Sequence, residues 1–367
     1  MELISEGKEN PMPLPQWKVT FEGQFFTVGK TREPSGKPLP FSGEFDWAGR
    51  HWLVPGVYCC REGLVVDLCM EVDPEELRAV RDKWDITPEN DDESQFSREK
   101  LMAIQAENPF HFFYSLQLVV NGKTLERSGG CGVCYAPFEG AVGTDLEAQW
   151  VVEHYQLDKT KGWYLWRWAF PWAKSGTSVK GLLVRLGLRK LFTLSLRLHG
   201  EPASVPGKPF QVGGPGDTAQ LADPTTGECY TLTVVENEAS TLNSVVPKDM
   251  LPENWEYPNH YRQLSYTLEP EPPKGFLTLC DQMDGDQPRI GQPSQLKKAT
   301  RGAGAASIGI IGGADGPTAI FVSGKSESQP YMAASSFHFE PMENVTWLPV
   351  FHKQTAEDTM VVLKKKL

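Results

Sequence analysis

Short stretches in which bulky apolar residues alternate with polar ones recur along the chain, and this period of two predicts β-strands. The expected strands or strand pairs cover residues 17–28, 51–72, 110–127, 149–157, 163–171, 182–198, 229–235, 261–268, 276–280, 346–351 and 359–363. Because these stretches are short and separated by turn residues, the expected fold class is mostly β. We expect a multi-unit β-sandwich-like architecture with one or two short helices.

Two segments carry helix patterns instead. Residues 74–86 follow Asp73, a good N-cap, and begin with Pro74, which suits the first helical position. A second short helix is expected near residues 97–107, where Pro109 prevents its continuation.

Two of the strand segments allow a more detailed interpretation. The dipeptide Asn121-Gly122 stands between two strand patterns and predicts a tight hairpin turn. In residues 163–172, five aromatic side chains fall on one face of an extended strand. An exposed aromatic ladder could stack on sugar rings, whereas a buried one would fill a sandwich core.

Glycine and proline clusters suggest where the chain divides. Residues 1–200 are expected to form an N-terminal β-sandwich-like domain that includes both short helices. A Pro- and Gly-rich stretch after residue 200 separates it from a smaller β domain at 201–290. Residues 291–367 are expected to form a linker and a C-terminal β-hairpin segment that carries a GGADGP turn.

Composition narrows the class of partner and the compartment. With 36 basic and 47 acidic residues the formal charge is −11, so a nucleic-acid partner is not expected. The first 15 residues hold no apolar run typical of a secretory signal, and seven cysteines at irregular spacing fit reduced thiols. We therefore expect a cytoplasmic protein without stable membrane insertion.

Cys131 and Cys134 have the spacing of half a metal site or of a redox pair. Two thiolates separated by two residues can face one ion or each other, depending on the local backbone. No second pair of this spacing accompanies them, so buried or turn thiols remain the alternative.

A specific motif stands near the C-terminus, where residues 307–324 read SIGIIGGADGPTAIFVSG. This stretch resembles the signature of the β subunit of sodium-translocating decarboxylases, a membrane subunit that acts on carboxybiotin. The resemblance implies that Asp315 matches the aspartate associated with sodium and proton coupling. It also implies that Gly312, Gly313 and Gly316 match the broken-helix segment around that aspartate. The tail that follows resembles uncharacterised bacterial proteins with the same signature, and this brings no activity with it.

The residues themselves favour another structure for this stretch. A coupling site of that kind needs a bundle of apolar spans of about 20 residues each, and the chain has no such set of segments. Two β-branched runs at 308–311 and 318–322 flank glycines, Asp315 and a proline, which is typical of a β-hairpin. A partner-docking peptide is a third interpretation.

Three functional hypotheses follow. The first is a binding or protein-interaction protein without catalysis, because strands and aromatics occur without a recognisable catalytic set or cofactor motif. The second is an accessory or relic of biotin-dependent decarboxylation, which depends on the signature around Asp315. The third is an enzyme that uses scattered residues such as Cys131, His154 or His338.

Overall fold

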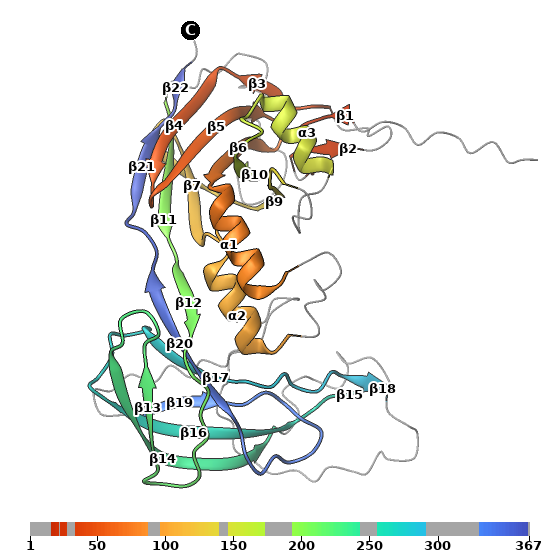
Figure 1. Ribbon diagram of the computed structural model, residues 1–367. Helices are drawn as coiled ribbons and strands as arrows, with labels where there is room; N and C mark the ends of the chain where they lie inside the picture. The colour runs from red at the N-terminus through yellow and green to blue at the C-terminus, as the bar shows by residue number, and fades with distance from the viewer. Residues whose placement is uncertain are drawn as a thin grey trace, which may run out of the picture. The chain divides into compact units, whose positions relative to one another are not determined.

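The computed structural model describes residues 16–21, 23–27, 34–86, 96–138, 146–172, 193–242, 255–290 and 330–365 (Figure 1). The chain divides into two compact units. The first unit comprises Met1–Asp91, Glu107–Glu201 and Gln354–Leu367, and the second comprises Asp92–Ala106 and Pro202–Lys353. The strands expected at 346–351 and 359–363 therefore do not belong to one segment, because the former pairs within the second unit and the latter within the first.

Two antiparallel sheets form the first unit. The larger has the order β22-β4-β5-β6-β10-β9, with β3 also paired to β5. Its strands are β3 (Lys37–Leu39), β4 (Phe41–Trp47), β5 (Arg50–Cys59), β6 (Gly63–Val72), β9 (Gly129–Tyr135), β10 (Gly162–Pro171) and β22 (Lys364–Lys365). The smaller has the order β21-β11-β7-β8, from β7 (Tyr114–Val120), β8 (Lys123–Glu126), β11 (Leu194–Gly200) and β21 (Thr359–Val362).

The main core of the first unit lies between these sheets. Along β10, Trp166 and Phe170 are buried in this core, and the other aromatics of the same face pack against it. The buried leucines of β7 and β11 contribute to the same cluster. The aromatic ladder is therefore core, and the mostly β, sandwich-like fold class is confirmed.

The opposite face of the larger sheet carries a helix and a small ribbon. Helix α3 (Leu146–Tyr155) buries Ala148, Val151 and Val152 there. Strands β1 (Gln16–Trp17) and β2 (Phe26–Thr27) pair with each other and form the N-terminal ribbon. The expected strand at 149–157 is wrong, because its buried residues recur at helical rather than alternating spacing.

The two expected helices and the expected hairpin are confirmed. Helix α1 (Pro74–Trp84) begins after Asp73, whose carboxylate accepts a hydrogen bond from the Glu75 amide. Helix α2 spans Arg98–Glu107. The turn between β7 and β8 has positive φ at both Asn121 and Gly122. With α3, the described residues hold three helices rather than one or two.

The second unit is also built of antiparallel sheets around one core, which includes Trp347 and Phe351. One sheet has the order β13-β14-β16-β19, from β13 (Thr218–Ala222), β14 (Cys229–Thr241), β16 (His260–Glu269) and β19 (Tyr331–Ala334). Another has the order β12-β20-β17, from β12 (Pro202–Pro206), β17 (Leu277–Asp281) and β20 (Trp347–Gln354). A separate ribbon pairs β15 (Trp255–Glu256) with β18 (Arg289–Ile290).

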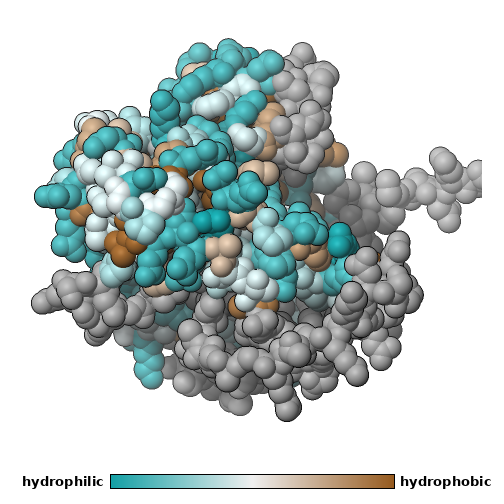
Figure 2. All heavy atoms as spheres, turned by 90° about the horizontal axis from the view of Figure 1, so that it is seen from below, coloured by the Kyte–Doolittle hydropathy of each residue, from teal (hydrophilic) through white to brown (hydrophobic). Residues whose placement is uncertain are grey.

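On the face shown in Figure 2, hydrophobic residues of the described part are scattered among hydrophilic ones rather than gathered in one broad area. Across the described ranges, no helix has the length and apolar character needed to cross a membrane. The GGADGP sequence with Asp315 lies outside the described residues.

Candidate functional site

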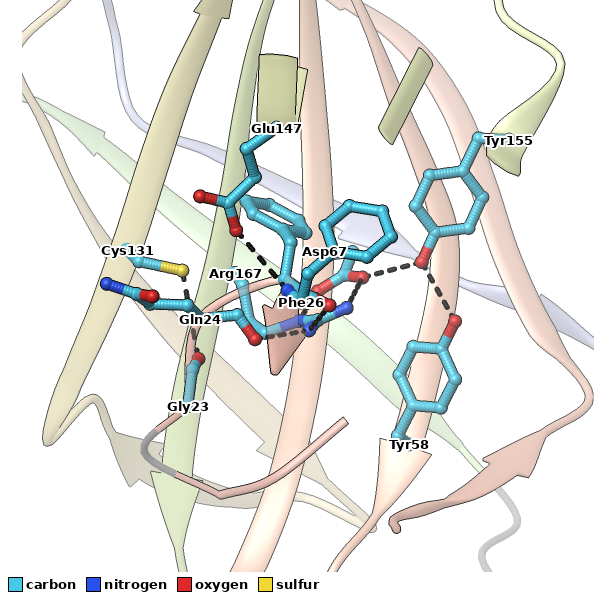
Figure 3. A network of polar contacts seen from close by, with 10 residues as sticks. Gly23, Gln24, Phe26, Tyr58, Asp67, Cys131, Glu147, Tyr155 and Arg167 are labelled. Carbon is cyan, nitrogen blue, oxygen red and sulfur yellow. Dashed lines mark hydrogen bonds and ion pairs between the residues drawn. The ribbon is translucent and has the colours of Figure 1, made fainter. Parts of the chain in front are cut away.

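A buried ion pair lies at the centre of the face that carries α3 and the N-terminal ribbon (Figure 3). Asp67 of β6 and Arg167 of β10 stand directly opposite each other in the sheet. The guanidinium holds the carboxylate through two hydrogen bonds, Nε to Oδ1 at 2.8 Å and Nη2 to Oδ2 at 2.7 Å. Their side chains are only 1% and 2% exposed, so each charge depends on the other for compensation.

Two tyrosines extend this pair toward α3 and β5. The Tyr155 hydroxyl donates to Oδ2 of Asp67 at 2.5 Å, and the Tyr58 hydroxyl lies 2.8 Å from that of Tyr155. Because the single Tyr155 proton goes to the carboxylate, Tyr58 is the donor of the second bond. Burial, reinforced by the Asp67 charge, raises the pKa of both tyrosines above the ordinary value. Both phenols are therefore neutral donors near pH 7.

The remaining arm of Arg167 holds the main chain of the N-terminal ribbon. Its Nη1 donates to the carbonyl oxygens of Gln24 and Phe25, at 3.0 and 3.3 Å. From α3, a carboxylate oxygen of Glu147 accepts the backbone N–H of Phe26 at 3.3 Å. The sheet and the helix thus hold three consecutive residues of the N-terminal segment by their main-chain carbonyl and N–H groups rather than by specific side chains.

Aromatic contacts also hold the N-terminal segment against the sheet and α3. The side chain of Phe25 is 1% exposed and its ring lies 4.6 Å from the guanidinium carbon of Arg167. Trp17 stacks on His154 with ring centroids 3.6 Å apart, and it also lies over the Arg167 guanidinium. Burial lowers the pKa of His154, so this imidazole is neutral near pH 7. Phe25 is therefore buried in the apolar cluster under α3, with the Arg167 guanidinium against its ring.

The two cysteines of the CxxC sequence are separated by the strand that carries them. β9 pairs with β10 without a register shift, so residues three apart point to opposite faces. Cys131 packs in the cluster under α3, where its thiol contacts the Gly23 carbonyl at 3.8 Å, and Cys134 packs against the core between the sheets. One ion therefore cannot contact both thiols in this geometry. No group of three or more His, Cys, Asp or Glu residues in the described part is arranged to hold a metal.

The protonation states limit what this network can do chemically. Burial raises the pKa of Cys131 to about 11, so its thiol keeps its proton near neutral pH and is a weak nucleophile. The neighbouring phenols are also protonated. The charges of Asp67 and Arg167 compensate each other through two direct hydrogen bonds. The arrangement can therefore bind a peptide main chain, because Arg167 supplies hydrogen-bond donors and Glu147 an acceptor. Beside them an apolar pocket, occupied by Phe25, accepts one aromatic ring.

The other sequence-predicted residues are not part of this network. His338 belongs to the second unit, where its Nδ1 lies 3.6 Å from Asp286 Oδ2. Its Nε2 is buried without a hydrogen-bond partner in the described residues. Asp315 and the glycines Gly312, Gly313 and Gly316 lie outside the described residues.

Sequence reasoning missed the central pair, although the chain carries a signal for it. Asp67 interrupts the apolar run GLVVDLCMEV, and Arg167 interrupts the aromatic run GWYLWRWAFP. Asp67 is the fully buried acid of its strand and Arg167 the one base of the other, so each needs a compensating charge, and they supply it by facing each other. Asp67 and Arg167 are 100 residues apart in the sequence, and only the register of β6 against β10 shows that they pair.

Comparison with known proteins gives no match: no protein family, no curated protein and no solved structure is similar to this chain.

Proposed function

We propose that this protein is a non-catalytic binding protein whose site accepts a peptide segment with one aromatic anchor. In the structure this site is filled in cis by residues 23–26 of the chain itself. The observation that carries the proposal is the set of hydrogen bonds by which Arg167 and Glu147 bind the main chain of residues 24–26. Recognition of backbone groups combined with one side-chain seat is a recurring mode of peptide binding.

The chemistry of the site defines the kind of peptide. Two adjacent carbonyls face the same nitrogen of Arg167, and the following N–H faces Glu147, so the peptide must bend at the anchor residue, because successive carbonyls of an extended strand point to opposite sides. The seat of Phe25 is lined by apolar side chains and by the guanidinium face, which favours an aromatic ring over an aliphatic chain. A partner segment with an aromatic residue at a bend of its main chain is therefore the ligand class.

Residues 23–26 compete with any partner peptide because they belong to the same chain as the site. For a short connection, the effective concentration of such a tethered segment is in the millimolar range. Phe25→Ala in the full-length protein should release the ribbon by removing its anchor. A fluorescein-labelled peptide with the sequence of residues 16–27 should then bind this variant in an anisotropy titration. Binding to the unaltered protein should be about tenfold weaker or more, since its site is occupied.

Two controls separate peptide recognition from general loosening. The labelled peptide carrying Phe25→Ala should not bind the variant protein. A protein with Phe113→Ala, which removes an exposed phenylalanine of the first unit outside the site, should behave like the unaltered protein. Absence of peptide binding by a folded Phe25→Ala protein would overturn the proposal.

The second candidate is an accessory role in sodium-translocating, biotin-dependent decarboxylation, and it is supported by the sequence of residues 307–324. It requires that the protein bind sodium or a biotinylated carrier domain, measured by equilibrium dialysis with radioactive sodium and by a carrier pull-down. Asp315→Asn should abolish the binding, whereas Asp284→Asn, in an exposed turn of the second unit, should not. If neither sodium nor carrier binds, this candidate is removed.

A cytoplasmic location belongs to the same proposal. None of the seven cysteines, which all lie among the described residues, forms a disulfide bond, and this supports a reducing environment.

A further inference from the structure

The outer strand of the larger sheet in the first unit has an unusual composition. β9 reads GGCGVCY and forms one edge of the sheet, since it pairs with β10 on one side and with no other strand of the described chain. It is seven residues long and follows β10 without a bulge. The strand thus presents a straight, uncharged edge.

The glycines of β9 keep its main chain exposed. Gly129, Gly130 and Gly132 are all exposed in the structure. A Cβ at Gly130 would lie 2.4 Å from the Trp168 ring, and one at Gly132 would lie 3.0 Å from the Tyr164 ring. The aromatic strand β10 therefore requires small residues on β9, and backbone groups are left at the surface as a consequence.

Other sheet edges of the first unit are protected in the usual manner. The opposite edge of the same sheet is β22, which consists of Lys364 and Lys365. Strand β8, an edge of the smaller sheet, carries Lys123 and Glu126. Charges, prolines, bulges and short length prevent edge strands from pairing with other chains. β9 has none of these features, so its edge is a template for a further strand.

We propose that β9 pairs antiparallel with β9 of a second copy of this chain and joins two larger sheets into one. Pairing over the full strand with a two-fold axis perpendicular to the sheet places Gly132 opposite itself. It then sets Gly129 opposite Tyr135 and Cys131 opposite Val133 of the second copy. The Tyr135 ring covers the glycine it faces, a cross-strand arrangement that stabilises glycine positions.

A second copy fits this edge better than a charged partner segment does. The chain carries a net charge of −11, so two copies repel each other over most of their surface. At β9 there is no charged side chain, and two copies can meet there without placing like charges opposite each other. The pairing is also self-complementary, because each glycine end of the strand meets an aromatic end.

The test is the oligomeric state of the full-length protein by sedimentation velocity. The unaltered protein should be dimeric at micromolar concentration. Gly129→Lys adds a charge at the edge, and a Cβ there meets nothing within 4 Å, so the fold should tolerate it. This variant should raise the dimer dissociation constant about tenfold or more. Gly214→Lys, at a position equally open in the second unit, should leave it unchanged.

A crosslink tests the register. With Val133→Cys, the new thiol faces the native Cys131 of the second copy, and mild oxidation with diamide should give a covalent dimer on non-reducing gels. Val119→Cys, at a half-buried position of β7, should not. A protein that is monomeric up to about 100 µM overturns the proposal. A dimer that is insensitive to Gly129→Lys and not crosslinked through Val133→Cys overturns it as well.

Discussion

Replacing Asp67 by leucine should remove a large part of the stability of the first unit. The substitution leaves the Arg167 guanidinium, 2% exposed, facing an apolar side chain in place of its two carboxylate bonds of 2.8 and 2.7 Å. Removing one partner of a buried pair typically costs about 3–5 kcal/mol, because the remaining charge is uncompensated. Domains are stable by roughly 5–15 kcal/mol, so about a fifth or more of the total free energy of unfolding is at stake.

The pair itself is tested by a double-mutant cycle in urea. Asp67→Leu and Arg167→Met should each destabilise, whereas the double variant should lose less than the sum, with a coupling of about 2 kcal/mol or more. Tryptophan fluorescence reports mainly on the first unit, since only Trp255 and Trp347 of the eleven tryptophans belong to the second.

An exposed pair provides the matched control. Glu153 and Lys159 form a 2.7 Å contact with both side chains more than half exposed, so breaking it should cost less than about 1 kcal/mol. If Asp67→Leu costs no more than this control, or if the two single losses are additive, the reasoning from buried charge is refuted.

Three further predictions concern individual groups. Tyr155→Phe removes a hydroxyl that is hydrogen-bonded to the Asp67 carboxylate and should lower the free energy of unfolding in urea by about 1–3 kcal/mol. Tyr135→Phe, whose hydroxyl makes an exposed hydrogen bond, should lower it clearly less. Equal losses for the two variants would contradict this prediction. Since burial raises the pKa of Cys131 to about 11, iodoacetamide should modify this thiol more slowly than the exposed Cys229 near neutral pH. The modification rate of Cys131 should keep rising with pH toward that pKa. A rate that levels off near neutral pH would argue against the prediction. Burial lowers the pKa of His352 below its ordinary 6.5, so the unfolded chain takes up the proton first as the pH falls. The stability of the second unit should therefore be constant above pH 6.5 and decline below it toward the folded pKa, and His352→Gln should flatten that decline.

Local features were predictable wherever neighbouring residues determine the conformation. The N-cap Asp73 and Pro74 were sufficient to place the start of α1, and Asn121-Gly122 placed the turn of a hairpin. In both cases the decisive contacts are made within a few residues. The alternation along residues 163–171 likewise predicted a strand with its aromatic residues on one face, and the structure decided that this face packs in the core.

Helix α3 was mistaken for a strand for an identifiable reason. Its sequence is rich in β-branched and aromatic residues, which are typical of strands. The buried positions Ala148, Val151 and Val152, together with the half-buried Tyr155, nevertheless follow helical spacing, and packing on the sheet face selects this period. Tertiary contacts thus outweighed a weak local preference.

The amino-acid sequence alone determined the β-rich class, the turns and the first helix, because these depend on period and on short-range hydrogen bonds. The tertiary structure decided the candidate site. It placed Asp67 opposite Arg167 across 100 positions, laid the N-terminal ribbon on that pair, and turned the thiols of Cys131 and Cys134 to opposite faces. Strand register governs each of these results, and register follows from the packing of whole sheets rather than from any short segment of the chain.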